Sequence, residues 1–268
     1  MRRVLVYDTL SDELLPYLRA APYASHWRAA TRDGVTSQVL SRKATLDRSG
    51  CVALCSAIDA ERDRTMDTVD HFAQHTLSLT IERLGSLVGG EAMERLLSFP
   101  TALLRQRKAE AANHLREAWA VAAEENADAG SNASEGLKPH AAAARAQTTT
   151  GQAGVQASME VARAAAKLSE QASACGFSVD AYVRRYSRHT RPWLGFHTDR
   201  SVVTVNVALA ADAAHTGGRL HAVLGGAHRI VEREEGEATV HSDDVMHGVS
   251  AMRSGVRYSL VMLFFLKQ

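Results

Sequence analysis

Cysteine is scarce in this chain of 268 residues, which contains Cys51, Cys55 and Cys175 and no others. Three thiols cannot build a disulfide framework, and Cys51 and Cys55 lack the two-residue spacing of a zinc knuckle. They lie one helical turn apart, so we expect them to be core residues. These features predict a reducing, intracellular environment.

Long apolar runs and a dominant charge are also missing. The longest apolar run, 256–266, is interrupted by Arg257 and Tyr258 and is far shorter than a membrane span. The first ten residues, MRRVLVYDTL, contain no apolar signal core, which argues against secretion and favours a cytoplasmic location. A net charge of +1 argues against a surface built for nucleic acid or for an anionic membrane.

Large apolar side chains almost disappear between residues 124 and 156, where Ala, Gly, Ser and Thr dominate. Such a stretch cannot bury enough surface to offset its ordering entropy, so we predict a flexible low-complexity insertion there. Residues 1–123 before it are predicted to form a helical N-terminal support region. Within that region the sequence predicts these helices: 51–62, one capped by Thr80 and ended by Gly89–Gly90, 91–97 before Pro100, and 102–123.

From about residue 178 the pattern changes to period two, which is typical of strands. Thr204, Asn206 and Ala208 alternate with valines, and a similar alternation runs through 256–265. Glycine pairs at 217–218 and 225–226 mark turns. Six or more short strands predict a β-sandwich or barrel in 157–268, and therefore an α+β fold for the chain.

Histidine is plentiful in this last third, and its spacing indicates chemistry. His197 and Asp199 are two residues apart, which places both side chains on one face of a strand. A histidine from a neighbouring strand would complete a triad of two imidazoles and one carboxylate, the signature of non-haem Fe(II) oxygenases. His247 is the candidate, because Arg257 follows it by ten residues and alternates with Ser259 on the final strand. An arginine fork with a hydroxyl suits a carboxylate, so we predict a dicarboxylic co-substrate held between iron and Arg257.

These residues carry a resemblance to a known family. The H-T-D at 197–199, the G-G-R-L at 217–220 and the H-G-V…G-x-R-Y-S-L from His247 are similar to the Fe(II)/2-oxoglutarate dioxygenase superfamily, and most of all to its prolyl-4-hydroxylase-like catalytic domain. The resemblance covers about residues 182–266. It implies a double-stranded β-helix (jelly-roll) core, with His197, Asp199 and His247 as iron ligands and catalytic residues. It also implies that Arg257 binds the distal carboxylate of 2-oxoglutarate, with Tyr186 and Ser259 as further co-substrate contacts.

The reaction that the resemblance implies is a hydroxylation that consumes 2-oxoglutarate and O₂ and releases succinate and CO₂. Ascorbate as a reductant belongs to the same set of expected cofactors. The prime substrate stays open between a prolyl or other amino-acid residue, a free amino acid and a small metabolite, because loops at the barrel mouth decide it. No membrane partner is expected.

Three other functions stay in competition at this point. A cupin-like metal-binding isomerase would have a similar barrel, but would have no reason to place Arg257 beside the metal. A non-catalytic interaction protein would not need the complete triad. Nucleic-acid demethylation would place the co-substrate arginines differently, and the near-neutral charge gives it no support.

Several single residues also have simpler interpretations. Arg257 could form a rim salt bridge with the glutamates at 232–237, and Tyr186 could serve packing alone. Asn206 is expected either to line the barrel or to be exposed. His241 is interpreted as a strand-end or rim residue. A basic cluster is interpreted as a solvated strand and loop; it consists of Arg184, Arg185, Arg188, His189 and Arg191.

Overall fold

The computed structural model describes residues 39–61, 65–66, 73–131, 156, 159, 163, 176–224 and 227–267. Residues 1–38 of the predicted N-terminal region and 132–155 of the predicted insertion lie outside the described residues. Internal contacts divide the chain into two compact units. One consists mainly of Thr36–Leu103 and Cys175–Gln268, and the other mainly of Leu104–Ala174.

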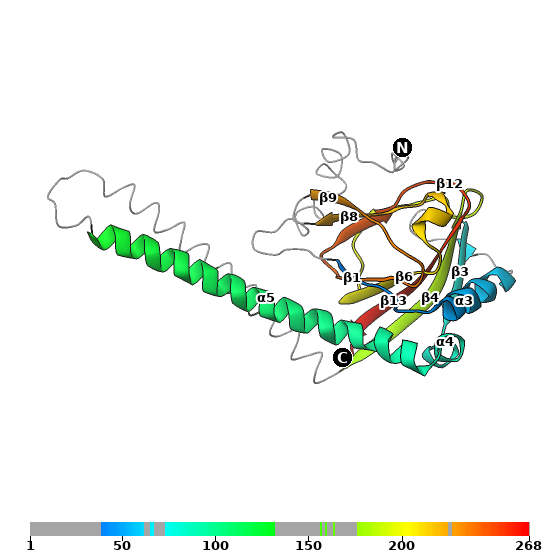
Figure 1. The fold of residues 1–268 in the computed structure, drawn as a ribbon, viewed down its shortest axis with the longest axis horizontal. Helices are drawn as coiled ribbons and strands as arrows, with labels where there is room; N and C mark the ends of the chain where they lie inside the picture. The colour runs from blue at the N-terminus through cyan, green and yellow to red at the C-terminus, as the bar shows by residue number, and fades with distance from the viewer. Residues whose placement is uncertain are drawn as a thin grey trace. The chain divides into compact units, whose positions relative to one another are not determined.

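Two antiparallel sheets form the centre of the first unit (Figure 1). The large sheet has the order β1-β10-β6-β13-β4-β3-β2. Its strands are β1 (Leu40–Arg42), β2 (Thr65–Met66), β3 (Ala73–Leu79), β4 (Phe177–Ser187), β6 (Val203–Ala208), β10 (Ala238–Ser242) and β13 (Val256–Leu266). The small sheet has the order β5-β11-β8-β9 and consists of β5 (Leu194–His197), β8 (Leu220–Leu224), β9 (Ala227–Val231) and β11 (Met246–Val249).

The chain passes back and forth between these sheets. From β4 to β13 it moves to the other sheet at each step, except at the β8–β9 hairpin and at the short pair β7 (Thr216–Gly217) and β12 (Met252–Ser254), which forms its own ribbon. This alternation is the topology of a double-stranded β-helix, or jelly roll. The predicted α+β fold with a jelly-roll core is therefore confirmed.

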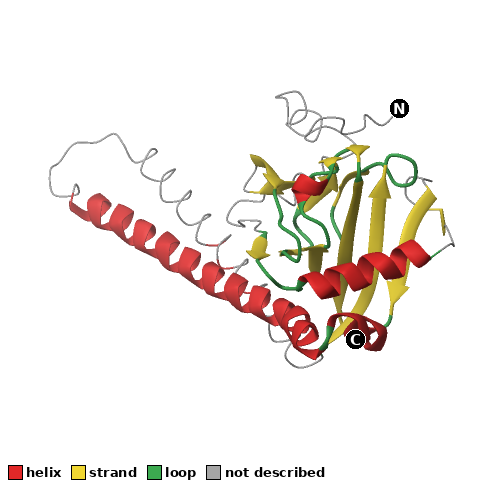
Figure 2. Cartoon of the chain, turned by 45° about the vertical axis from the view of Figure 1, so that its right-hand side comes forward, coloured by secondary structure: helices red, strands yellow, loops and turns green. Residues whose placement is uncertain are grey.

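The large sheet has two chemically different faces, because strand side chains alternate. Val183, Leu260 and Val207 are cross-strand neighbours on one face, which we call the outer face. Tyr258, also on this face, donates a hydrogen bond to Asp59 of helix α3 (Arg48–Ala60) at 2.8 Å, so the helical layer covers it (Figure 2). Arg257 and Ser259 point the other way, toward what we call the inner face.

Helices α3 and α4 (Ile81–Val88) form where the sequence predicts them. The side chain of Asp47 accepts the N–H of Gly50 at 2.8 Å and caps α3. Thr80 caps α4 as predicted, and Gly89 ends it in the left-handed region with φ 85°. Leu54, Ile58 and Leu84 are fully buried where α3 and α4 meet the strands β3 and β4.

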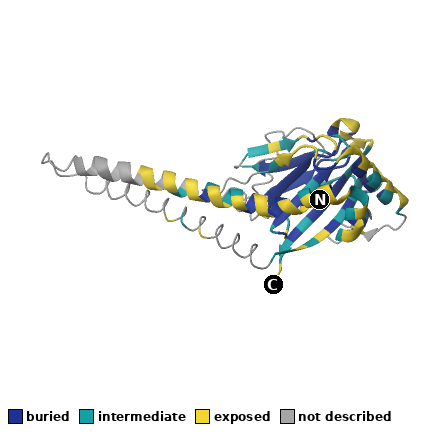
Figure 3. Cartoon of the chain, turned by 60° about the horizontal axis from the view of Figure 1, so that its bottom comes forward, coloured by how far each residue is buried: buried dark blue, intermediate teal, exposed yellow. Residues whose placement is uncertain are grey.

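Proline does not separate the next helices as expected. Instead of two helices ending and beginning around Pro100, one helix, α5 (Gly90–Ser131), contains it and continues into the first residues of the predicted insertion. Pro100 removes one backbone donor and disfavours the helical state of Phe99. Burial of Leu96, Phe99 and Leu103 on the same stretch offsets that cost. Farther along, most of the described side chains of α5 are exposed (Figure 3). Trp119 among them is 57% exposed. Neither α5 nor any other helix among the described residues is long and apolar enough to cross a membrane.

Candidate functional site

The three predicted metal ligands meet at one place between the sheets. His197 ends β5, His247 lies opposite it in β11, and Asp199 follows in the loop after β5. The Nε2 atom of His197 is 3.5 Å from Asp199 Oδ1, and that of His247 is 3.7 Å from Asp199 Oδ2. One potential ligand atom from each residue lies within 4.8 Å of the others. The structure therefore brings the predicted triad together.

The ring orientation of both histidines suits a metal. Nδ1 of His197 lies 2.9 Å from the carbonyl oxygen of Gly195, and Nδ1 of His247 lies 3.1 Å from that of Val245. A carbonyl can only accept, so each Nδ1 carries the proton and donates it. Each Nε2 is then left with a lone pair directed toward Asp199. Backbone anchoring of this kind is typical of metal-binding histidines.

The protonation states agree with that orientation. Burial and the nearby His197 lower the pKa of His247 to about 3, so His247 is neutral at neutral pH. Burial alone would raise the pKa of Asp199, but the neighbouring rings of His247, His197 and His241 together hold it well below its ordinary value. The side chain of Thr204 on β6 donates a 2.6 Å hydrogen bond to Asp199 Oδ2. One carboxylate and two imidazoles form a donor set that suits divalent iron.

The structure corrects the interpretation of His241 as a rim residue. This histidine is 3% exposed, and its Nε2 lies 3.9 Å from Asp199 Oδ2. Strand pairing explains its place, because His241 on β10 is the Cα partner of Thr204 and both side chains point to the inner face. Its ring centroid is 4.5 Å from that of His247. A third imidazole therefore borders the triad.

Arg257 does not form the rim salt bridge that the nearby glutamates made conceivable. It is 1% exposed, and none of its three guanidinium nitrogens has a hydrogen-bond partner among the described residues. The guanidinium carbon lies 4.7 Å from the ring centroid of Tyr186, its cross-strand partner on β4. Ser259, on the same face of β13, is fully buried and its hydroxyl also has no partner within that part of the chain. The three predicted co-substrate contacts thus lie on one inner surface.

Glycine makes room for this surface. Gly217 and Gly218 have φ of 72° and 67°, in the left-handed region that favours glycine. A Cβ on Gly218 would lie 2.2 Å from the sulfur of Met252 and 3.4 Å from Cδ of Arg257. Met252, Tyr186 and Val249 form a small apolar cluster beside the arginine. The predicted glycine turn therefore lets the chain pass close to the Arg257 side chain.

Sequence reasoning missed two buried charged residues at this surface. Arg233 follows β9, is 4% exposed, and donates from Nη1 to Oδ1 of Asn206 at 2.8 Å. Asp212, in the short η2 turn (Asp212–Ala214), lies beside it. The alternation of Thr204, Asn206 and Ala208 was the signal that could have located this polar face, since it places Asn206 inside the barrel. The lining role of Asn206, left open by the sequence, is the one that the structure has.

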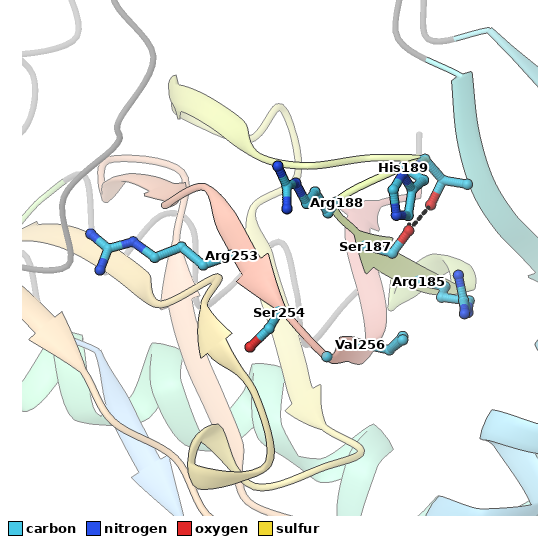
Figure 4. A pocket seen from close by; sticks show the side chains of 9 residues that line it. Arg185, Ser187, Arg188, His189, Arg253, Ser254 and Val256 are labelled. Carbon is cyan, nitrogen blue, oxygen red and sulfur yellow. Dashed lines mark hydrogen bonds between the residues drawn. The ribbon is translucent and has the colours of Figure 1, made fainter.

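The predicted basic cluster is only partly solvated. Arg188 and His189 are exposed, but Arg191 is fully buried. A pocket of about 420 Å³ lies where β4 ends and β13 begins, with Arg185, Arg188 and Arg253 in its lining (Figure 4). No residue of the triad borders it, so this pocket is separate from the candidate metal site.

Known proteins were compared with the whole chain. No protein-family model matches it, and no curated protein matches it. Several solved structures do. The matched structures include a member of the 2-oxoglutarate Fe(II) oxygenase family, at low sequence identity.

Three of these structures show how broad the likeness is. A prolyl-4-hydroxylase from Pseudomonas putida has a TM-score of 0.47 at 15% identity, covering 90% of this chain and 99% of that one. The viral collagen prolyl hydroxylase of Paramecium Bursaria Chlorella virus-1 has 0.44 at 10% identity, covering 86% and 96%. SnoN, an α-ketoglutarate-dependent epimerase from nogalamycin biosynthesis, has 0.44 at 13%, covering 90% and 81%. Similarity at this level leaves the chemistry to be inferred from the side chains of the site.

Proposed function

We propose that the chain is an Fe(II)- and 2-oxoglutarate-dependent oxygenase that hydroxylates a prolyl or other amino-acid residue, or a small metabolite. One observation carries the proposal. A His–Asp–His cluster with free Nε2 lone pairs lies in the interior of a jelly roll, together with a buried arginine that has no hydrogen-bond partner among the described residues. A buried guanidinium that no acid neutralises is costly unless a ligand pairs with it. A dicarboxylic co-substrate would supply that pair.

Each residue has a distinct part in this proposal. His197, Asp199 and His247 would hold the iron, whose chemistry when bound is the activation of O₂ coupled to oxidation of 2-oxoglutarate to succinate and CO₂. Arg257 would neutralise and orient the distal carboxylate, and the Ser259 hydroxyl would donate to it. The apolar cluster around Tyr186 would keep water from this end of the co-substrate. Ascorbate would serve as a reductant that restores iron to the ferrous state.

The test of this function is an anaerobic titration. Metal-stripped protein is given Fe(II) and then 2-oxoglutarate, and the visible metal-to-ligand charge-transfer absorption is recorded. We expect the band in the wild type and its loss in His247→Ala, with His189→Ala as the control because His189 is an exposed turn residue. Release of succinate in the presence of candidate substrates then identifies the prime substrate.

His241 gives the cupin-like alternative one specific support. Three imidazoles and a carboxylate surround one spot, and cupin-type sites also combine three histidines with an acid. Iron binding without any charge-transfer band on addition of 2-oxoglutarate would favour a metal-binding isomerase on this barrel. Failure to bind iron at all would contradict both enzymes and favour an interaction protein.

A further inference from the structure

Two strands of the large sheet place a second arginine on the same inner face as Arg257. Val261 on β13 is the Cα partner of Asn206 on β6, and Ser259 is the partner of Ala208. Cross-strand partners share a face, so Asn206 points to the same inner face as Arg257 and Ser259. Because Nη1 of Arg233 donates to Asn206 at 2.8 Å, the guanidinium of Arg233 lies on this face as well.

Arg233 is held by its backbone and by one nitrogen only. Its backbone N–H donates to Asp212 Oδ2 at 3.1 Å, which fixes the chain as it leaves β9. Its Nη2 lies 3.9 Å from Asp212 Oδ1, beyond hydrogen-bond distance. Nε and Nη2 have no hydrogen-bond partner within the described part of the chain, although the residue is 4% exposed. The fork of Arg233 therefore has donors available in the interior.

Among the described residues, the acids do not balance the positive charges of this interior. Burial, together with the positive charge of Arg257, lowers the pKa of Arg233 to about 9. Arg233 is still protonated at neutral pH. Asp212 is the acid that the structure places within 4 Å of its guanidinium among the described residues. Arg219 shares this acid, since its Nη1 lies 3.7 Å from Asp212 Oδ2, and Glu237 is the other buried acid whose charge acts on Arg233. Three arginines against two acids leave room for one further negative charge.

We infer that Arg233 is a second co-substrate-binding residue, which with Arg257 forms a two-arginine clamp on the distal carboxylate of the 2-oxo acid. The inference rests on the proposed oxygenase function. Asn206 positions the clamp by holding Nη1, so that Nε and Nη2 remain for the ligand. A carboxylate accepts up to about four hydrogen bonds, which two guanidinium forks can supply. The clamp makes a distal carboxylate a requirement for tight binding.

The experiment measures the affinity of Fe(II)-loaded protein for two 2-oxo acids under anaerobic conditions. 2-Oxoglutarate has the distal carboxylate, and 2-oxobutyrate lacks it. We expect Arg233→Met to weaken 2-oxoglutarate binding by at least about 10-fold, as the loss of a charge-assisted hydrogen bond does, and to leave 2-oxobutyrate binding nearly unchanged. Arg233→Lys, which keeps the charge and loses the fork, should give an intermediate loss.

The matched control is Arg229→Met, which removes the same charge from an exposed position of β9. Unchanged 2-oxoglutarate affinity in a folded Arg233→Met overturns the inference, as does an equal loss for both acids, which indicates a merely structural role. If Arg233→Met does not fold, Arg233→Lys decides by the same criterion. A wild type that shows no 2-oxoglutarate binding contradicts the proposed function itself, whereas wild-type binding with indifferent Arg233 variants contradicts the clamp alone.

Discussion

The two faces of the large sheet are made by alternate residues of the same strands, yet one is apolar and the other carries unpaired polar groups. On the outer face, Val207, Leu260 and Met262 are fully buried against the helical layer. On the inner face, Arg257 and Ser259 are equally buried, but their polar atoms have no hydrogen-bond partners within the described residues. The outer face needs no ligand, because these apolar side chains leave no polar group unpaired. The inner face carries buried donors that a polar ligand could pair, and leaving such donors unpaired costs free energy.

Truncating neighbouring residues of β13 tests this difference between the two faces most directly. Leu260→Ala should lower the free energy of unfolding by about 2–5 kcal/mol, since it opens a cavity in a closed apolar layer. Ser259→Ala, one residue away, should change it by less than about 0.5 kcal/mol, because its hydroxyl has no partner to lose. Urea denaturation of both variants checks this. A large destabilisation by Ser259→Ala would show that the inner face is satisfied without a ligand.

Replacing Thr204 by Val tests how the inner face holds its carboxylate. Thr204→Val keeps the shape but removes the 2.6 Å hydrogen bond to Asp199. Iron affinity should fall by about 10- to 100-fold, the usual effect of losing a partner that orients a ligand. Competition for Fe(II) against a chelator measures it. Thr239→Val is the matched control, because Thr239 is buried on the same face and its hydroxyl donates to the backbone of Asn206. Equal losses in both variants would refute a specific role for Thr204.

The smallest expected effect is a pH dependence of stability that comes from the outer side of the small sheet. His247 points inward, whereas His221, the Cα partner of Gly248, points outward and bonds His228 at 2.8 Å between ring nitrogens. Burial and His221 lower the pKa of His228 to about 4. The unfolded chain therefore binds the proton more readily, and stability should rise as the pH goes from about 4 to 6.5.

His228 is half-exposed, so its share of this dependence should stay below about 1 kcal/mol. Thermal melts of metal-free protein at pH 5 and pH 7 measure it. His228→Asn should reduce the difference between the two melting temperatures, and His189→Asn, at an exposed turn, should preserve it. An unchanged difference in His228→Asn would contradict the assignment.

Much of the site could be predicted because His197 and Asp199, and likewise Arg257 and Ser259, are only two residues apart. The alternation of Arg257 with Ser259 on β13 places both side chains on one face, as expected. The H-x-D spacing brings His197 and Asp199 to the same site, but Asp199 lies in the loop after β5 and not on the strand. The place of His241 could not be predicted, because its distance from His247 along the chain does not show that it pairs with Thr204 on the adjacent strand. Arg233 left no signal at all, since it lies in a connection after β9 whose path only the folded chain defines.

The helical region also shows where prediction from local sequence signals succeeds and where it fails. Caps such as Thr80 are local, so the start of α4 could be read from the sequence. Pro100 is a local stop signal as well, but the burial of Phe99 and Leu103 overrides it. Packing energy comes from partners distant in sequence, and a local rule cannot include it.

The strand periodicity, the His–Asp–His triad and the arginine that follows it could be read from the sequence alone, because each depends on the spacing of residues along the chain. Which other charges enter the interior becomes visible only in the folded chain. The fold places His241 beside Asp199 and Arg233 beside Asn206. The physical reason is that the register between strands and the path of connections set the distances between residues far apart in the chain.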